Sequence, residues 1–258
     1  MDISLVIKKH LSIIEKQENI RILYATESGS RAWGFPSPDS DYDVRFIYMR
    51  PKSFYLKLEK TKDVVEYMLD EELDINGWDI DKTLRLLYKS NPTLFEWINS
   101  PIIYREAPEF TSIRSLAQKY FLSAPAMYHY YNMARNNNRE FLKRDSVRIK
   151  KYFYVLRPIL ACKWVIAHNT APPMLFSELV DTQLDTAVKS IVYSLLERKA
   201  ITSELGEEEP IMKLNHYIDH ELLILDQKIK ALPKQSPLPW HRLNEMFLKL
   251  LNNGGEIR

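Results

Sequence analysis

Two aspartates, Asp41 and Asp43, stand one residue apart at the start of an alternating stretch, DYDVRFIYM. In a β-strand, residues two positions apart project from the same face. Two ionised carboxylates held so close repel each other unless a cation lies between them, and their hard oxygens suit Mg²⁺ or Mn²⁺. Alone the pair is a weak signal, because two solvated acids at a strand edge would also explain it.

A glycine-serine turn precedes the aspartates by a short loop and makes the pattern more specific. Gly29 lets the backbone approach a ligand closely, and Ser30 offers a small hydroxyl beside free backbone amides that can hold an anion. Arg31 adds a fixed positive charge. An anion-binding turn followed by paired carboxylates would suit a phosphate that is bound together with a metal ion.

The elements that must position these residues can be predicted from periodicity. Apolar spacing predicts a helix over residues 3–18, and alternation predicts strands over 21–26 and 41–49. Residues 64–69 and 73–78 are typical of a hairpin across Asp70, Glu71 and Glu72, after which Asp79 or Asp81 suits a helix N-cap. These elements predict an α+β unit with a small mixed sheet and flanking helices.

Strand patterns fade after residue 110, where amphipathic helices follow one another to the end of the chain. We therefore expect a catalytic domain over residues 1–108 and a helical domain over 109–258. Residues 114–163 carry 11 Lys and Arg but only two acids, although the net charge of the whole chain is only +2. This basic block is typical either of a solvated helix face or of a surface that meets phosphate.

Composition excludes several other classes of protein. Cys162 is the only cysteine, so the chain can form neither an internal disulfide nor a cysteine-based metal site. No apolar run approaches the length of a membrane span, and the acids near the N-terminus argue against a signal peptide. We expect a cytoplasmic protein without a membrane partner.

The stretch GSRAWGFPSPDSDYDV resembles the signature of the DNA polymerase β-type nucleotidyltransferase superfamily, in which a Gly-Ser pair and a loop precede Asp-x-Asp. More narrowly, the chain is similar to nucleotidyltransferases of the RlaP type, which are linked to RNA repair. Residues 74–104, 150–165 and 171–176 also fit that group. The resemblance covers most of residues 20–180.

The resemblance implies roles for these residues. Asp41 and Asp43 match two of three catalytic carboxylates that bind two divalent ions, and the third comes from a later strand. Asp74 is our first choice for the third, with Asp79 as the rival, although Asp79 stands where an N-cap is expected. Gly29 and Ser30 would contact the β- and γ-phosphates, and Arg31 would neutralise the pyrophosphate.

A further nucleotide-binding group is expected on the helix that covers residues 150–165. Lys150, Tyr154 and Arg157 share one face at helical spacing, with Lys151 beside them. Cations for the phosphates and a ring for the base or ribose suit a triphosphate, and related enzymes close the nucleotide and acceptor cleft with a helical domain. The alternative is a surface face along which an arginine lays its stem.

These expectations describe a Mg²⁺-dependent (or Mn²⁺-dependent) nucleotidyltransferase that moves NMP from an NTP, in the first place ATP, to a hydroxyl and releases pyrophosphate. An RNA 3′ end is the expected acceptor, as in RNA repair, tRNA repair or tailing. The alternatives are AMPylation of a protein, nucleotidylation of a small molecule, and a non-catalytic module that binds nucleotide.

Overall fold

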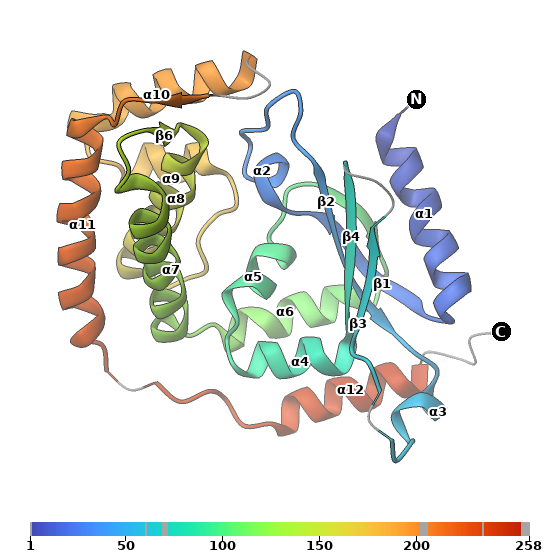
Figure 1. Cartoon of the computed structure of the whole chain (residues 1–258). Helices are drawn as coiled ribbons and strands as arrows, with labels where there is room; N and C mark the ends of the chain where they lie inside the picture. Colours follow the sequence, from blue (N-terminus) through green and yellow to red (C-terminus); the bar gives the residue numbers. More distant parts are fainter. Residues whose placement is uncertain (1, 60, 69–71, 202–205, 234, 254–258) are drawn as a thin grey trace. The chain divides into compact units, whose positions relative to one another are not determined.

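The computed structural model describes the whole chain apart from residues 1, 60, 69–71, 202–205, 234 and 254–258 (Figure 1). The chain divides into two compact units. The sheet unit comprises Met1–Gly29, Asp41–Phe121 and Pro237–Arg258, and the helical unit comprises Ser30–Ser40 and Leu122–Ser236. Each unit is therefore assembled from separate stretches of the chain.

A five-stranded mixed sheet organises the sheet unit, in the order β3-β4-β2-β1-β5. Strands β2 and β4 are parallel, whereas the other neighbouring strands are antiparallel. The strands in chain order are β1 (Arg21–Glu27), β2 (Tyr42–Met49), β3 (Val64–Met68), β4 (Leu73–Asp79) and β5 (Ile103–Glu106). Because β2 and β4 run in the same direction, the residues that begin these two strands lie side by side.

Helix α1 (Ile3–Glu18) covers one face of the sheet. The Asp2 carboxylate accepts a hydrogen bond from the Ser4 amide and caps the helix N-terminus. The helix buries its apolar stripe, Ile7, Leu11 and Ile14, against side chains of β1, β2 and β4. Alternation along β2 and β4 therefore assigns one face of each strand to this core and leaves the other face for different neighbours.

The opposite face of the sheet packs against α5 and α6. The Tyr24 ring stacks on Phe110 with centroids 4.2 Å apart, and Trp78 stacks on Trp97 at 3.8 Å. The helices of the sheet unit besides α1 are α3 (Lys52–Tyr55), α4 (Ile80–Tyr88), α5 (Pro92–Ile98), α6 (Phe110–Tyr120) and α12 (His241–Asn253). Helix α12 returns from the far end of the chain and packs on α4.

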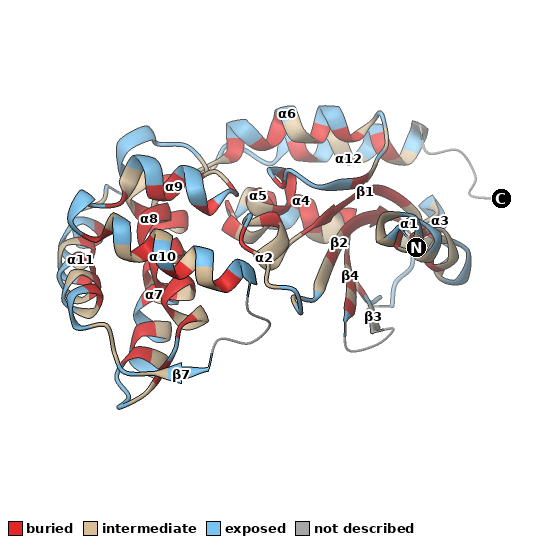
Figure 2. Ribbon diagram, turned by 90° about the horizontal axis from the view of Figure 1, so that it is seen from above, coloured by how far each residue is buried: buried red, intermediate tan, exposed pale blue. Residues whose placement is uncertain are grey.

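The helical unit is built around α7 and α8, whose inward faces carry buried residues (Figure 2). Phe153, Leu156 and Leu160 on α8 are fully buried. The elements of this unit are α2 (Gly29–Ala32, which begins in the sheet unit), α7 (Ser123–Asn137), the π-helix η1 (Asn138–Leu142), β6 (Val147–Arg148), α8 (Lys150–His168), α9 (Phe176–Gln183), α10 (Thr186–Ile201), β7 (Glu207–Glu208) and α11 (Met212–Lys230).

The predicted α+β class with a small mixed sheet is confirmed, as are the helix over 3–18 and the strands of the predicted hairpin. Asp70 and Glu71 of the hairpin turn lie outside the described residues. Two local details differ from expectation: β1 extends to Glu27, one residue beyond the predicted strand, and residues 29–32 of the glycine-serine turn form the short helix α2. The domains expected over residues 1–108 and 109–258 stay a prediction. The two units are compact groups of residues, and their compactness does not show which part of the chain folds independently.

Within the part of the chain that the structure describes, no helix combines the length and the apolar character that a bilayer crossing requires.

Candidate active site

Asp43 and Asp74 lie directly opposite each other in the parallel pair of β2 and β4. Their strand neighbours Val44 and Ile75 belong to the core under α1, so the two carboxylates project from the other face of the sheet. The side chains are partly open to solvent, with exposed fractions of 31% and 45%. The structure thus brings together one member of the Asp-x-Asp pair and the residue chosen as the third carboxylate.

Arg45 joins these two carboxylates. Its Nη2 atom lies 2.8 Å from Asp43 Oδ1 and 2.8 Å from Asp74 Oδ2. Nη1 donates to the backbone oxygens of Val44 and Asp74 at 3.2 Å. The guanidinium therefore sits between the two acids as their shared counterion.

Gly29 lies against the other oxygen of Asp43. The Ser28 amide donates to the Asp43 carbonyl at 2.8 Å, and Gly29 follows with a φ of +60°, a conformation that glycine adopts without strain. A Cβ built on Gly29 would stand 2.0 Å from Asp43 Oδ2, which is an impossible contact. The glycine is therefore required both by its backbone conformation and by the space that Asp43 takes.

Glu27, which was not among the site residues expected from the sequence, supports this arrangement from inside the protein. Its side chain is fully buried, Oε1 accepts the Asp43 amide at 2.8 Å, and the Tyr104 hydroxyl donates to Oε2 at 2.5 Å. The available signal was an acid at the end of the strand-like run RILYATE, directly after residues 22–26. Glu27 ties the end of β1 to the start of β2, the segment that carries Asp43.

Burial raises the pKa of the Asp43 carboxyl above its ordinary value. Arg45 opposes this effect, while the negative charges of Asp74 and Asp41 add to it. Asp43 is consequently a carboxylate whose ionised form gains from any further cation placed beside it.

Asp41 and Asp79, the other predicted carboxylates, occupy different surroundings. Asp41 is an exposed residue just before β2, close enough to influence Asp43 electrostatically. Asp79 is 2% exposed at the far end of β4, where it caps α4 by accepting the Asp81 amide at 2.9 Å. The Tyr55 hydroxyl also contacts it at 3.1 Å. Asp79 therefore stands opposite Tyr48, away from Asp43, and has a structural role as an N-cap.

The residues near Asp43 suit a hard divalent cation in their chemistry. Asp41, Asp43 and Asp74 offer carboxylate oxygens, the ligands that Mg²⁺ prefers, and Gly29 packs against Asp43 Oδ2. Among the described residues, no three acidic, histidine or cysteine side chains are already arranged around a metal position. The donors fit a divalent ion, although Arg45 holds two of them at present.

Ser30 and Arg31, the remaining residues of the glycine-serine motif, belong to the helical unit. There the Arg31 guanidinium donates to the Ser40 carbonyl at 2.6 Å and closes the loop over residues 30–40. Lys199, which is 6% exposed on α10, donates to the Phe35 carbonyl at 2.8 Å. The loop that carries Ser30 is thus held by buried contacts inside the helical unit.

The predicted nucleotide ligands on α8 separate into two groups. Lys150, Lys151 and Tyr154 are partly exposed near the start of the helix. Arg157 is only 3% exposed, and its guanidinium packs 4.5 Å from the centre of the Trp33 ring. In this structure Arg157 is a packing partner of the loop that follows Ser30, whereas the other three residues reach the surface.

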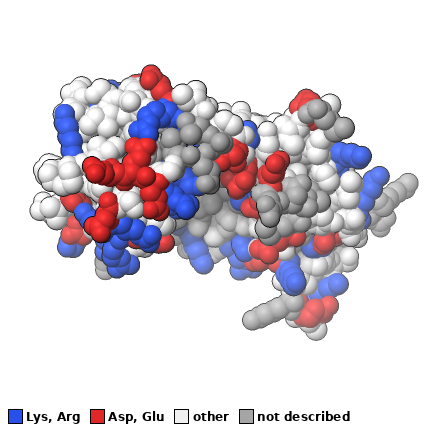
Figure 3. All heavy atoms as spheres, turned by 45° about the horizontal axis from the view of Figure 1, so that its top comes forward, with Lys and Arg blue, Asp and Glu red and all other residues white. Residues whose placement is uncertain are grey.

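Lys151 belongs to a small basic cluster, which we define as Arg144, Arg148, Lys150 and Lys151. Burial lowers the pKa of Lys151, and repulsion from the other three members of the cluster adds to this effect. The Lys151 ammonium also lies 3.7 Å from the centre of the Phe141 ring. Basic and acidic side chains are interspersed over the face drawn in Figure 3.

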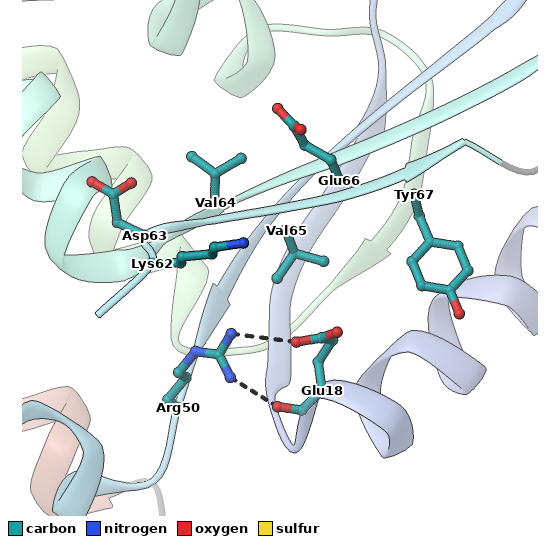
Figure 4. A pocket seen from close by; sticks show the side chains of 8 residues that line it. All are labelled: Glu18, Arg50, Lys62, Asp63, Val64, Val65, Glu66 and Tyr67. Carbon is teal, nitrogen blue, oxygen red and sulfur yellow. Dashed lines mark hydrogen bonds and ion pairs between the residues drawn. The ribbon is translucent and has the colours of Figure 1, made fainter. Parts of the chain in front are cut away.

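A pocket of about 490 Å³ lies elsewhere in the sheet unit, under the edge strand β3 (Figure 4). The Arg50 guanidinium, which lines it, donates to the backbone oxygen and the carboxylate of Glu18. Lys62 and Tyr67 also line the pocket. None of the predicted site residues takes part in it, and its mixture of charges indicates no particular ligand.

Comparisons with known proteins agree with the motif. The family model described as "RlaP: RNA repair pathway DNA polymerase beta family" matches residues 3–249. The uncharacterized protein YcgL of Bacillus subtilis (strain 168) is 45% identical over 242 residues, which cover 92% of each chain. A crystal structure of a nucleotidyltransferase-like protein from Exiguobacterium sibiricum 255-15 covers 97% of this chain and 89% of its own, with 13% identity and a TM-score of 0.32, a similarity too low to support an inference. The match over nearly the whole chain establishes that this protein belongs to the RlaP family of RNA repair pathway DNA polymerase β-type nucleotidyltransferases.

Proposed function

We propose that the protein is a divalent-metal-dependent nucleotidyltransferase that transfers NMP from an NTP to the 3′ hydroxyl of an RNA. The observation that carries the proposal is the packing of Gly29 against Asp43 on the face of the sheet where Asp74 also lies. Gly29, the first residue of the proposed phosphate-binding turn, is thereby adjacent to two carboxylates of the sheet unit. Membership of the family supports the reaction class.

The roles follow from the chemistry of each side chain. Asp41, Asp43 and Asp74 would hold Mg²⁺ or Mn²⁺, which supplies charge neutralisation at the phosphates and lowers the pKa of the attacking hydroxyl. The reaction forms a bond between the acceptor oxygen and the α-phosphorus, and it breaks the bond from that phosphorus to the pyrophosphate, while the hydroxyl proton is released. Gly29 and Ser30 bind the β- and γ-phosphates, and Arg31 opposes the charge of the departing pyrophosphate.

Lys150, Lys151, Tyr154 and Arg157 stay our proposed ligands for the rest of the nucleotide. The partial exposure of the first three supports a binding role, because part of each side chain faces solvent. Arg157 would act through Trp33, whose ring its guanidinium covers, and would fix the loop that carries Ser30.

RNA is our proposed acceptor because of the basic cluster. Burial and then repulsion from Lys150, Arg148 and Arg144 lower the pKa of Lys151, and phosphates beside these cations would relieve the repulsion. The partly exposed rings of Phe141 and Tyr154 beside Lys151 provide surfaces on which a base can stack. We place the protein in the cytoplasm, where NTP and RNA are both available.

The test incubates the purified protein with each α-labelled NTP, Mg²⁺ and total cellular RNA. We expect label in an RNase-sensitive product with the wild type and none with the D41N/D43N double variant. The matched control is D63N/D81N, which removes two carboxylates of the same unit that pair with Lys82 and Arg85. It should retain activity.

Other outcomes select the alternatives. Label in a protease-sensitive band would point to AMPylation of a protein, and label in a small product would point to a low-molecular-weight acceptor. Nucleotide binding without pyrophosphate release in any fraction would contradict the proposal and favour a non-catalytic module.

A further inference from the structure

Arg45 occupies the point at which a cation shared by Asp43 and Asp74 would be expected. A single atom, Nη2, contacts both carboxylates at 2.8 Å. The side chain is only 17% exposed, and Nη1 is anchored to two backbone oxygens. The guanidinium is therefore a fixed part of the site and not a mobile surface charge.

The two oxygens of Asp43 consequently have different partners. Oδ1 accepts from Arg45, whereas Oδ2 lies beside Gly29 at the turn proposed to bind phosphate. An ion that contacted Oδ2 alone would leave Arg45 in place. An ion that bridges Asp43 and Asp74 must take the position of Nη2, because two cations cannot share one point between two carboxylates.

We propose that Arg45 is a resident counterion that competes with a divalent metal ion for Asp43 and Asp74. Without metal, the Arg45 guanidinium neutralises the negative charges of Asp43 and Asp74. A metal ion can bind between these two aspartates only when the guanidinium moves aside. This proposal rests on the proposed function, in which these aspartates bind metal. It adds that Arg45 sets the affinity of Asp43 and Asp74 for the metal ion.

The first test measures Mn²⁺ binding in the absence of nucleotide, by the electron paramagnetic resonance signal of the free ion. For R45M we expect an apparent affinity about tenfold higher than that of the wild type, a change equivalent to about 1.4 kcal/mol. R45K, whose ammonium cannot hold the two carboxylates and the two backbone oxygens together, should fall between them. The control is R85M, which removes an exposed ion pair with Asp81 in the same unit and should leave affinity unchanged.

A second measurement separates competition from simple structural support. In EDTA, R45M should unfold at a lower temperature than the wild type because Asp43 and Asp74 face each other without a counterion. Saturating Mn²⁺ should raise the unfolding temperature of R45M more than that of the wild type. If Mn²⁺ leaves the deficit of R45M unchanged, Arg45 only supports the fold and the proposal is wrong.

The remaining outcomes also decide the matter. Equal Mn²⁺ affinity of R45M and the wild type, or no Mn²⁺ binding by either protein, would overturn the counterion role. The labelled-NTP assay on the wild type reports separately on the proposed function. Transfer by the wild type with unchanged R45M affinity would refute the counterion role alone, whereas tighter binding by R45M without any transfer would refute only the function.

Discussion

Replacing Gly29 with alanine should disable the site while leaving most of the fold intact. The new Cβ would stand 2.0 Å from Asp43 Oδ2 and 3.0 Å from Asp43 Cγ, so the carboxylate must retreat by about 1 Å or more to reach an ordinary contact. Misplacing a catalytic group by about 1 Å can reduce the rate about 100-fold. We expect a loss of at least that size in the rate of NMP transfer, together with weaker Mn²⁺ binding.

The stability cost of the same substitution is predicted to be modest. A left-handed backbone conformation costs a non-glycine residue about 1–2 kcal/mol, which is a minor part of the stability of a domain. Urea unfolding of G29A should therefore show a lower midpoint but an intact cooperative transition. The loss of activity would then be local and would not reflect general unfolding.

Gly34 provides a matched control for the energetic cost of placing alanine in a left-handed backbone conformation. Its φ of +81° imposes the same kind of strain, but its added Cβ would approach only the Leu175 Cδ2 atom, at 3.0 Å. G34A should lose similar stability and retain much more activity than G29A. If G29A transferred NMP at the wild-type rate with its fold preserved, or if G34A were equally inactive, the proposed contact between the turn and Asp43 would have no catalytic meaning.

Three further predictions concern other parts of the molecule. Burial raises the pKa of Asp79 to about 6, so ionisation of this carboxyl destabilises the fold: its contribution is most favourable below about pH 4 and is lost as the pH rises through 6. Asn is an equally good N-cap but carries no charge at any pH. In urea titrations, the stability of D79N relative to the wild type should therefore rise by about 3 kcal/mol between pH 4 and 7.5. A stability difference that does not change with pH would contradict this reasoning. The E27L variant leaves the Asp43 amide and the Tyr104 hydroxyl without their acceptor, so its free energy of unfolding should fall by about 1–3 kcal/mol for each of them. The E27Q variant still accepts from the amide and should lose less stability. Equal losses in the two variants would refute the supporting role of Glu27. In fluorescence anisotropy with single-stranded RNA, R144Q/R148Q should reduce the slope of log affinity against log salt by about 1.4, and K228Q on α11 should not change it.

The parts of the fold that follow from local periodicity could be predicted from the sequence. Alternation along residues 41–49 and helical spacing along 3–18 depend only on neighbouring residues, and both elements are present. Strand β5 was missed because it is short and shows no alternation: Ile103 is 44% exposed at the edge of the sheet. A four-residue edge strand is recognisable only from the partner to which it pairs.

The residue types of the candidate site could be proposed from the sequence, but the contacts between them could not. The spacing of Asp41 and Asp43 predicted a shared strand face, the predicted strand over residues 73–78 suggested Asp74, and the catalytic role of all three stays a prediction. The position of Arg45 between Asp43 and Asp74 depends on the parallel register of β2 and β4, which no local pattern encodes. Arg157 illustrates the same limit, because helical spacing places it beside Tyr154, whereas a distant loop residue, Trp33, covers it.

The sheet unit includes a segment, residues 237–258, that is synthesised long after its other parts. Helix α12 packs on α4, the Trp240 ring stacks on Tyr88 at 3.7 Å, and Phe247 meets Tyr55 at 5.2 Å. On the ribosome these partners emerge only after the whole helical unit has been synthesised. The apolar surface along α4 therefore stays uncovered until α12 has been synthesised, and truncation before residue 237 would leave that surface exposed to aggregation.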